Sequence, residues 1–331
     1  MKNLRTLSFL AASIGLAACG PSSGPEVSTT ADAVPAPAVA SGPAPTAVPQ
    51  IGLVMKTLTN PFFIEMEKGA RKAEKELGVS LQVKTAAQET SIEQQIQLVD
   101  DLVAAKVAAI VIAPAESQRL VPSLQKAAAA GIKLVNIDNR LDPKAIKDAG
   151  MAPVPFVSVD NDAGAFKAGT FLASLASGPA KAAILEGIRG ADNARQRMEG
   201  AKRGLLAQKG ISVVASETAN WKIDEAYSVT KALFAKHPDV SLLFAANDMM
   251  ALGALKYLQE TKKTKVKVAG YDAMSEALTE IKAGTLAATI DQQAAEQGYQ
   301  GVALAVRLLK GEAVPELTLI DTRLITAAEL Q

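Results

Sequence analysis

The sequence has 331 residues and carries 35 basic against 34 acidic side chains, which gives a formal net charge of +1. This balance, without any cluster of basic residues, excludes the positive surface that a nucleic-acid partner requires. His237 is the only histidine and Cys19 the only cysteine, so the chain cannot form a His/Cys metal cluster, and an enzyme built on it would have to use carboxylates. We expect neither a metal nor any other cofactor.

The first 19 residues have the pattern of a secretory signal: Lys2 and Arg5 precede an apolar run at 7–18 that is too short to span a membrane. The run ends in Leu-Ala-Ala-Cys, which is similar to the bacterial lipobox, where the signal is cut before the cysteine and the cysteine is lipidated. A single cysteine in an exported chain has an evident use at this position. We therefore expect Cys19 to anchor the protein to a membrane; an ordinary signal peptide cut nearby is the alternative.

Residues 20–50 are rich in proline, alanine, serine and threonine and almost free of charge. Such a segment cannot bury a hydrophobic core, so we expect a disordered tether that holds the body away from a membrane surface. The remaining residues, 51–331, are enough for two domains of ordinary size.

The folded part begins with a short apolar run at 51–55 that reads as a strand buried on both faces. Asn60 and Pro61 then predict a helix start, because the asparagine side chain can cap a backbone donor and proline fits the first helical position. Apolar residues continue at three- and four-residue steps up to Leu77. Asn60 and Phe62 are left at the mouth of this helix, where they form a candidate recognition pair or, alternatively, a cap and a core ring.

The alternation of strand and helix then repeats along the chain. Further strands are expected at 81–85, 109–113 and 134–137. A polar stretch at 139–155 then interrupts the alternation. After it, a strand at 156–160 leads into a second set at 182–185, 213–216, 242–246, 266–269 and 286–290. Helices are expected at 91–105, 117–130, 193–208, 224–236, 248–259 and 293–309. The pattern predicts an α/β fold of two doubly wound parallel-sheet lobes with a ligand cleft at the carboxyl ends of the strands.

Acids and amides gather where these strands end, and an arginine and the only tryptophan lie near the same edge. Carboxylates and amides bond hydroxyl groups, arginine holds oxygens in a rigid fork, and aromatic faces cover the apolar face of a ring. Each acid or amide taken alone could be a helix cap. Together they predict a sugar site, and its candidates are Asn60, Phe62, Asp138, Arg195, Trp221, Asn247, Asp248, Asp272, Asp291 and Gln292.

Several stretches of the folded part resemble the periplasmic sugar-binding proteins of ribose-type ABC transporters, the type I periplasmic binding protein family. They are the stretches 59–63, 246–254, 270–272 and 286–292. The resemblance implies hydrogen bonds to the sugar from Asn60, Asp138, Arg195, Asn247, Asp272 and Gln292, and aromatic contacts from Phe62, Phe63 and Trp221. Asn139 stands where ribose binders have an arginine, and we count it among the expected ligand-binding residues.

The resemblance also implies a three-strand hinge, with the chain crossing between the lobes near Ser158, Gln292 and Asp321. The first lobe would comprise 51–158 with 293–321, and the second 159–292 with 322–331. Asn139 and Trp221 both depart from the ribose-binding pattern and favour a six-membered ring over ribose, with a pentose, a hexose and a cyclitol such as inositol left open.

The function expected from this resemblance is that of a solute-binding lipoprotein at the extracytoplasmic face or in the periplasm. It would be a monomer without enzymatic activity that closes on a monosaccharide and delivers it to an ABC permease. A ligand sensor for a chemoreceptor or a sensor kinase would use the same site. A repressor of the lactose-repressor type would need a DNA-reading headpiece where the lipobox and tether stand, and a glycosidase could use two of the carboxylates.

Overall fold

The computed structural model describes Gly24 and residues 48–331. The expected signal, Cys19 with its lipobox, and nearly all of the expected tether lie outside the described residues. Residues Ala47–Gln331 form one compact unit. Within the described part of the chain, none of the helices has both the length and the apolar character needed to cross a bilayer.

The first lobe is built on a six-stranded sheet in which all neighbouring strands run parallel, in the order β11-β5-β4-β3-β1-β2. Its register places Ile51 of β1 between Leu81 of β2 and Ala109 of β3. The strands are β1 (Gln50–Met55), β2 (Ser80–Thr85), β3 (Ala109–Ile112), β4 (Lys133–Ile137), β5 (Phe156–Val159) and β11 (Leu317–Ile320).

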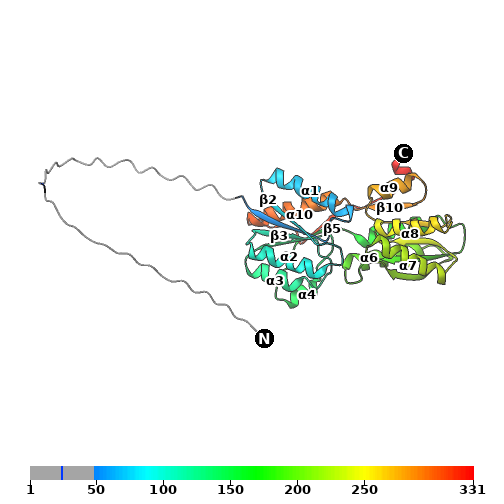
Figure 1. Cartoon of the computed structure of the whole chain (residues 1–331), viewed down its shortest axis with the longest axis horizontal. Coiled ribbons are helices and arrows are strands. Elements are labelled where there is room, and N and C mark those ends of the chain that lie inside the picture. The colour runs from blue at the N-terminus through cyan, green and yellow to red at the C-terminus, as the bar shows by residue number, and fades with distance from the viewer. Residues whose placement is uncertain (1–23, 25–47) are drawn as a thin grey trace, which may run out of the picture. The chain divides into compact units, whose positions relative to one another are not determined.

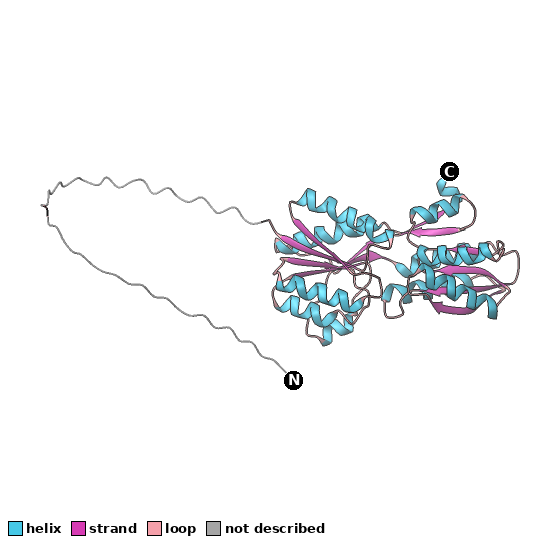
Figure 2. Cartoon of the chain, in the orientation of Figure 1, coloured by secondary structure: helices cyan, strands magenta, loops and turns pink. Residues whose placement is uncertain are grey.

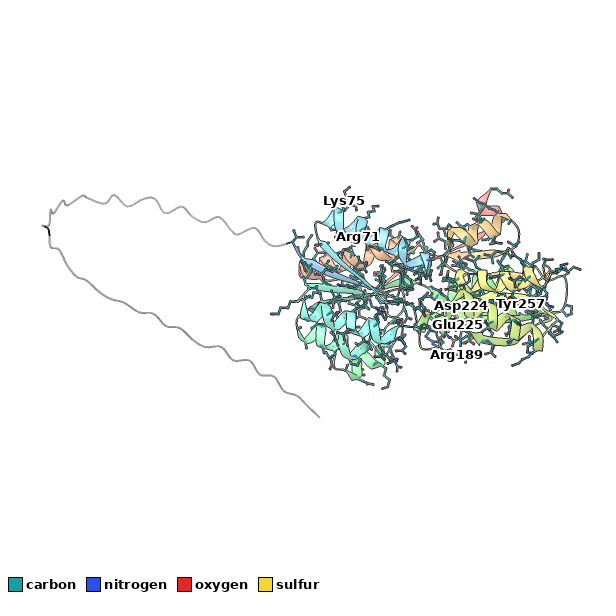
Figure 3. All side chains as sticks on the ribbon, viewed as in Figure 1. Arg71, Lys75, Arg189, Asp224, Glu225 and Tyr257 are labelled. Atoms are coloured by element: carbon teal, nitrogen blue, oxygen red, sulfur yellow. The ribbon has the colours of Figure 1, made fainter. Side chains whose placement is uncertain are left out.

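Helices cover both faces of this sheet, so its strands read as nearly continuous apolar runs. Helices α1 (Pro61–Leu77) and α10 (Ala294–Leu309) lie on one face, and α2 (Ile92–Ala104), α3 (Val121–Ala129) and the short α4 (Pro143–Asp148) lie on the other (Figure 1). On the polar face of α1, the exposed Lys75 points away from the sheet (Figure 3).

The second lobe has six strands in the order β12-β10-β9-β8-β6-β7, and only the edge strand β12 pairs antiparallel. Helices flank the strands here as in the first lobe (Figure 2). The strands are β6 (Ala180–Glu186), β7 (Ile211–Thr218), β8 (Val240–Ala245), β9 (Lys267–Ala269), β10 (Ala288–Asp291) and β12 (Arg323–Thr326). The helices are α5 (Asn161–Ser174), α6 (Asp192–Leu206), α7 (Ile223–Lys236), α8 (Asp248–Glu260), α9 (Ser275–Lys282) and a terminal 3₁₀ turn (Ala327–Leu330).

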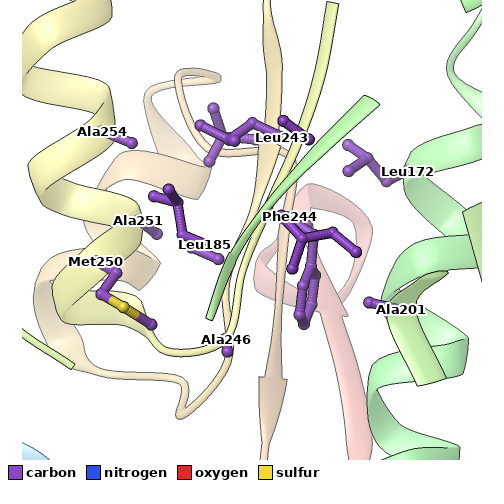
Figure 4. Packing of buried hydrophobic residues seen from close by; sticks show 14 of the residues in the cluster. Leu172, Leu185, Ala201, Leu243, Phe244, Ala246, Met250, Ala251 and Ala254 are labelled. Atoms are coloured by element: carbon purple, nitrogen blue, oxygen red, sulfur yellow. The ribbon is translucent and has the colours of Figure 1, made fainter. Parts of the chain in front are cut away.

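The core of the second lobe shows the layered packing directly. Leu185 of β6 and Phe244 of β8 lie between Met250 and Ala254 of α8 on one side and Ala201 of α6 on the other (Figure 4). All five side chains are fully buried. The lobe therefore has its own hydrophobic core on both faces of its sheet.

The expected α/β fold with two lobes is confirmed, with two differences. The edge strand β12 and the helices α4, α5 and α9 are absent from the prediction. The sequence pattern did not predict α5, because Gly164 and Gly169 lower the helix propensity of that segment. Tertiary packing explains Gly169, since a side chain there would meet the backbone of Ala201 in α6.

The two sheets are connected three times: between β5 and β6, between β10 and β11, and between β11 and β12. The helix that follows each of the first two crossings packs closely on a second helix. Gly69 of α1 faces the carbonyl oxygen of Ala295 in α10, and Gly169 of α5 faces that of Ala201 in α6, so that a methyl group at either glycine would overlap its neighbour. The residue boundaries of the two lobes remain a prediction.

Candidate ligand-binding site

A polar cavity lies where loops from the carboxyl ends of both sheets meet. The volume of this cavity is only about 10 Å³, so the lining side chains meet closely around it. Five charged side chains, four amides and three aromatic rings line it: Lys56, Glu89, Asp138, Arg197, Asp272, Asn60, Asn193, Asn247, Gln292, Phe62, Phe63 and Trp221.

The start of α1 supplies Asn60 and the two phenylalanines. The Asn60 Oδ1 atom accepts a hydrogen bond from the backbone N–H of Phe62 at 3.0 Å, which caps the helix as the Asn-Pro sequence predicts. Its Nδ2 atom donates to the Glu89 carboxylate at 2.9 Å. The rings of Phe62 and Phe63 meet edge to face, with centroids 5.0 Å apart. One asparagine thus fixes both the helix start and a buried acid.

A buried ion pair joins the ends of two first-lobe strands. Lys56 follows β1 directly and its Nζ atom lies 2.7 Å from an Asp138 carboxylate oxygen, just after β4. Both side chains are at most 3% exposed. The backbone of Asp138 is left-handed, with φ at 64°, and its carbonyl oxygen accepts a hydrogen bond from the Ser158 hydroxyl at 2.7 Å. Left-handed non-glycine residues cost energy and concentrate at functional sites.

Glu89 is the second acid of the first-lobe wall. Burial raises the pKa of its carboxyl, and the nearby Lys56 ammonium and the Asn60 hydrogen bond only partly oppose that rise. The wall therefore offers a carboxyl that is more easily protonated than a free one, beside a lysine and an amide. It can accept or donate hydrogen bonds toward the cavity.

Arg197 dominates the second-lobe wall. Its guanidinium donates to the Asn161 side chain at 2.8 Å, to the Ala246 carbonyl at 2.9 Å and to the Gln292 side chain at 3.1 Å. It also stacks on the ring of Tyr271, 3.8 Å from the ring centroid. These contacts hold the fork in one orientation from four directions.

Asp272 lies next to this arginine. One carboxylate oxygen accepts a hydrogen bond from the Gln292 amide at 2.6 Å and lies 3.5 Å from the Arg197 guanidinium. Burial raises the pKa of Asp272 and the Arg197 charge acts against it. Like Asp138, Asp272 has a positive φ, here 127°. Each lobe therefore presents one aspartate to the cavity from a residue with a strained backbone.

Trp221 reaches the cavity from the loop after β7. Its backbone is left-handed, with φ at 67°, and its carbonyl oxygen accepts a hydrogen bond from the Asn247 amide at 3.3 Å. The ring packs against Gly187, where any Cβ would overlap it. The other side of Asn247 caps α8 by accepting from the Met250 N–H at 2.9 Å. Asn247 thus both caps α8 and lines the cavity.

The structure brings eight of the ten expected ligand-binding residues to the cavity. It does not bring Arg195 there: that side chain is half exposed and pairs on the helix surface with Asp192 at 2.6 Å and Glu199 at 3.0 Å. The correction is Arg197, because residues two apart on a helix point to nearly opposite sides. The eight that line the cavity are Asn60, Phe62, Phe63, Asp138, Trp221, Asn247, Asp272 and Gln292.

Asn139 is the other residue that does not line the cavity. Its side chain is fully buried beside it, donating to the Pro114 carbonyl at 3.1 Å and accepting from the backbone N–H of Asn193 at 3.2 Å. Asp138 faces Lys56, whereas the side chain of the next residue, Asn139, is held by Pro114 and the start of α6. Four lining residues were missed from the sequence: Lys56, Glu89, Asn193 and Arg197.

Two α/β lobes that enclose a polar cavity at their strand ends define a binding protein of the closing-lobe class. The sequence also matches the family described as periplasmic binding protein domain, over residues 51–313. The chain belongs to this family, whose fold is the type I periplasmic binding protein fold.

Three similar proteins place the chain within the family. It is 40% identical to the D-ribose/D-allose-binding protein of Pseudomonas aeruginosa, over 80% of this chain and 83% of that one. It is 33% identical to the D-allose-binding periplasmic protein of Escherichia coli, over 85% and 93%. A solute-binding protein from Actinobacillus succinogenes, solved with bound D-allose, superimposes with a TM-score of 0.80 at 36% identity, covering 85% of this chain and 98% of the other.

Proposed function

We propose that this protein captures a monosaccharide between its two lobes and delivers it to an ABC permease, as a lipoprotein held at the extracytoplasmic face of a membrane through Cys19. The observation that carries the sugar site is a pair of buried polar atoms without a protein partner: Asn193 Oδ1 and Trp221 Nε1, both on residues that line the cavity. Buried polar groups are normally satisfied, so an acceptor and a donor left open predict a ligand with hydroxyl groups.

The rest of the wall fits the same ligand class. Carboxylates accept from hydroxyl groups, while Arg197, Lys56 and the amides donate to hydroxyl and ring oxygens. Phe62 and Phe63 in the first lobe and Trp221 in the second offer apolar faces for the C–H groups of a sugar ring. A sugar is the small molecule that presents both surfaces at once. Relatives named for D-ribose and D-allose bind ligands of this kind.

Within that class we propose a six-membered ring, with D-allose as the first candidate. Trp221 provides a larger aromatic face than a phenylalanine would, which suits the larger ring. Relatives named or solved with D-allose support this choice. D-Ribose and myo-inositol are the alternatives, the latter because a similar solved structure holds it.

The experiment is a melting-temperature panel with D-allose, D-ribose, D-glucose and myo-inositol, followed by calorimetric titration of each sugar that binds. A ligand at a hundred times its dissociation constant adds about 2.7 kcal/mol to the free energy of unfolding. Trp221 is the only tryptophan, so its fluorescence reports binding independently. The proposal fails if none of the four sugars raises the melting temperature or changes the emission.

The anchor has a test of its own. Cys19→Ser should release the protein from the membrane fraction while leaving sugar binding intact, because lipid chains supply about 0.8 kcal/mol per buried CH₂. Retention of the variant in membranes after a high-salt wash would place the anchor elsewhere. Delivery to a permease is tested by sugar uptake in cells that lack the gene for this protein.

A further inference from the structure

The N-terminus of α6 has no capping side chain of its own. Ala191 stands at the cap position, where serine, threonine, asparagine or aspartate would normally satisfy a free N–H. The first N–H groups of a helix have no partner within the helix. Those of Asp192 and Asn193 must therefore find partners elsewhere or face water.

Their partners come from the other lobe. The backbone N–H of Asp192 donates to the Ser117 hydroxyl at 3.0 Å, and that of Asn193 donates to the Asn139 Oδ1 atom at 3.2 Å. The backbone N–H of Ser117 in turn donates to the Gly190 carbonyl at 3.1 Å. Ser117 follows β3 and Asn139 follows β4 of the first sheet, whereas α6 belongs to the second lobe (Figure 1).

The two capping side chains are held in place within the first lobe. Asn139 donates from Nδ2 to the Pro114 carbonyl at 3.1 Å and to the Ser117 hydroxyl at 3.4 Å. Its own carbonyl accepts from the Asn136 side chain at 2.7 Å. Asn139 is fully buried and Ser117 nearly so. The acceptors are thus oriented toward α6 by bonds that do not depend on the second lobe.

We propose that Ser117 and Asn139 form an interlobe latch, which caps α6 only when the lobes are closed and so sets the balance between the open and closed forms. Neither side chain lines the cavity. The latch therefore acts on affinity indirectly: when only a fraction of the molecules is binding-competent, the apparent dissociation constant rises by the inverse of that fraction. Measuring the latch through sugar affinity rests on the proposed function, whereas the contact between the lobes does not.

The test compares Ser117→Ala and Asn139→Ala with the unaltered mature chain, using D-allose and D-ribose as ligands. Each lost hydrogen bond should weaken binding by about two- to twelvefold, since a net hydrogen bond is worth roughly 0.5–1.5 kcal/mol. Stopped-flow Trp221 fluorescence should assign the loss to faster dissociation with an unchanged association rate. The sugar-free variants should have a radius of gyration in small-angle scattering at least as large as that of the unaltered chain.

Ser174→Ala is the matched control, because its hydroxyl donates to the Phe171 carbonyl within α5, away from the lobe contact. It should leave both rates unchanged. If Asn139→Ala does not fold, Ser117→Ala carries the same test, since it leaves the Asn136 and Pro114 contacts of Asn139 in place.

Two results overturn the latch. A dissociation rate that stays within about 1.5-fold of the unaltered value, with only the melting temperature lowered, makes these bonds purely structural. A loss of affinity through slower association, without any change in dissociation, means that these bonds do not hold the closed form together. If no sugar binds the unaltered chain, the proposed function fails, and sugar-free amide hydrogen exchange still tests the latch. The latch variants should then expose the first turn of α6, and equal exchange would overturn it.

Discussion

The two helix starts that face each other across the cavity are built differently. Helix α1 carries its own cap, Asn60, followed by Pro61 at the first helical position. Helix α6 has Ala191 at its cap position, which supplies no capping side chain. Its first N–H groups instead donate to the side chains of Ser117 and Asn139 in the opposite lobe. The start of α1 is therefore complete in its own lobe, whereas the start of α6 is complete only when the lobes meet. The comparison shows that α6 presents the surface that depends on lobe closure.

The largest expected effect on sugar binding comes from a substitution in α6. Arg197→Ala should weaken sugar binding by more than a hundredfold, because removing one partner of a buried charged pair costs about 3–5 kcal/mol and leaves Asp272 and Gln292 without their guanidinium. Calorimetric titration with D-allose measures the loss.

Arg195→Ala is the matched control on the same helix. Its ion pairs are exposed, and such pairs contribute little, so affinity should stay within about twofold. Equal losses from the two variants would contradict the assignment of Arg197 to the cavity and of Arg195 to the surface.

A third helix start, that of α8, sharpens the comparison through pH. Burial raises the pKa of Asp248 to about 6, against the hydrogen bonds it accepts from the Met274 N–H and the Thr289 hydroxyl. A raised carboxyl pKa favours folding fully below the unfolded value near 3.8, and that contribution is lost as the pH rises through about 6. About two pKa units correspond to at most roughly 3 kcal/mol.

Urea unfolding at pH 4, 5, 6 and 7 measures this contribution. The free energy of unfolding should fall less steeply with rising pH in Asp248→Asn than in the unaltered chain, whatever the absolute cost of the substitution. Parallel pH profiles would show that Asp248 does not titrate in this range.

The self-contained cap of α1 gives a smaller effect. Asn60→Ala should lower the free energy of unfolding by about 1–2 kcal/mol in the sugar-free protein, because the Phe62 N–H loses its acceptor and Glu89 loses its amide donor. Asn60→Ser keeps a capping hydroxyl and should recover part of the loss. Denaturant titration of both variants checks this. If Asn60→Ala lowered the free energy of unfolding only in the presence of sugar, the cap of α1 would not be independent of lobe closure.

The smallest effect concerns the aromatic face beside α6. Trp221→Phe keeps a flat ring but reduces its area, so D-allose should lose about 1 kcal/mol more than D-ribose if the ring stacks on the sugar. Titration of both sugars against the variant gives the difference. Equal losses would mean that Trp221 only packs its own loop, against the space left by Gly187.

The choice between Arg195 and Arg197 could have been made from the sequence. Ala194, Arg197 and Ala201 follow one another at helical spacing on the buried face of α6, so Arg197 is an arginine within an apolar stripe. Lys56 could likewise have been found by the rule that selected Asp138, since both follow a strand of the first sheet directly.

Other parts of the site carry no such signal. Glu89 lies in a loop four residues beyond the end of β2, and only the folded chain brings it to Asn60. The role of Asn139 depends on a helix in the other lobe, more than fifty residues further along the chain. Helix α5 was missed because Gly164 packs against the Tyr271 ring and Gly169 against α6, and these contacts do not show in local helix propensity. Long-range partners thus decide what local sequence patterns leave open.

The close helix pairs have a mechanical consequence. At Gly69 the backbone of α1 touches that of α10, and at Gly169 the backbone of α5 touches that of α6. Backbones in direct contact leave little side-chain padding to deform, and well-packed interiors transmit strain. Helices α5 and α10 each follow a crossing between the sheets. We therefore expect a rotation of the chain at the crossings to move α6 together with α5, and α1 together with α10. As a consequence, we expect the cavity-lining residues at the starts of α1 and α6 to move together with these crossings.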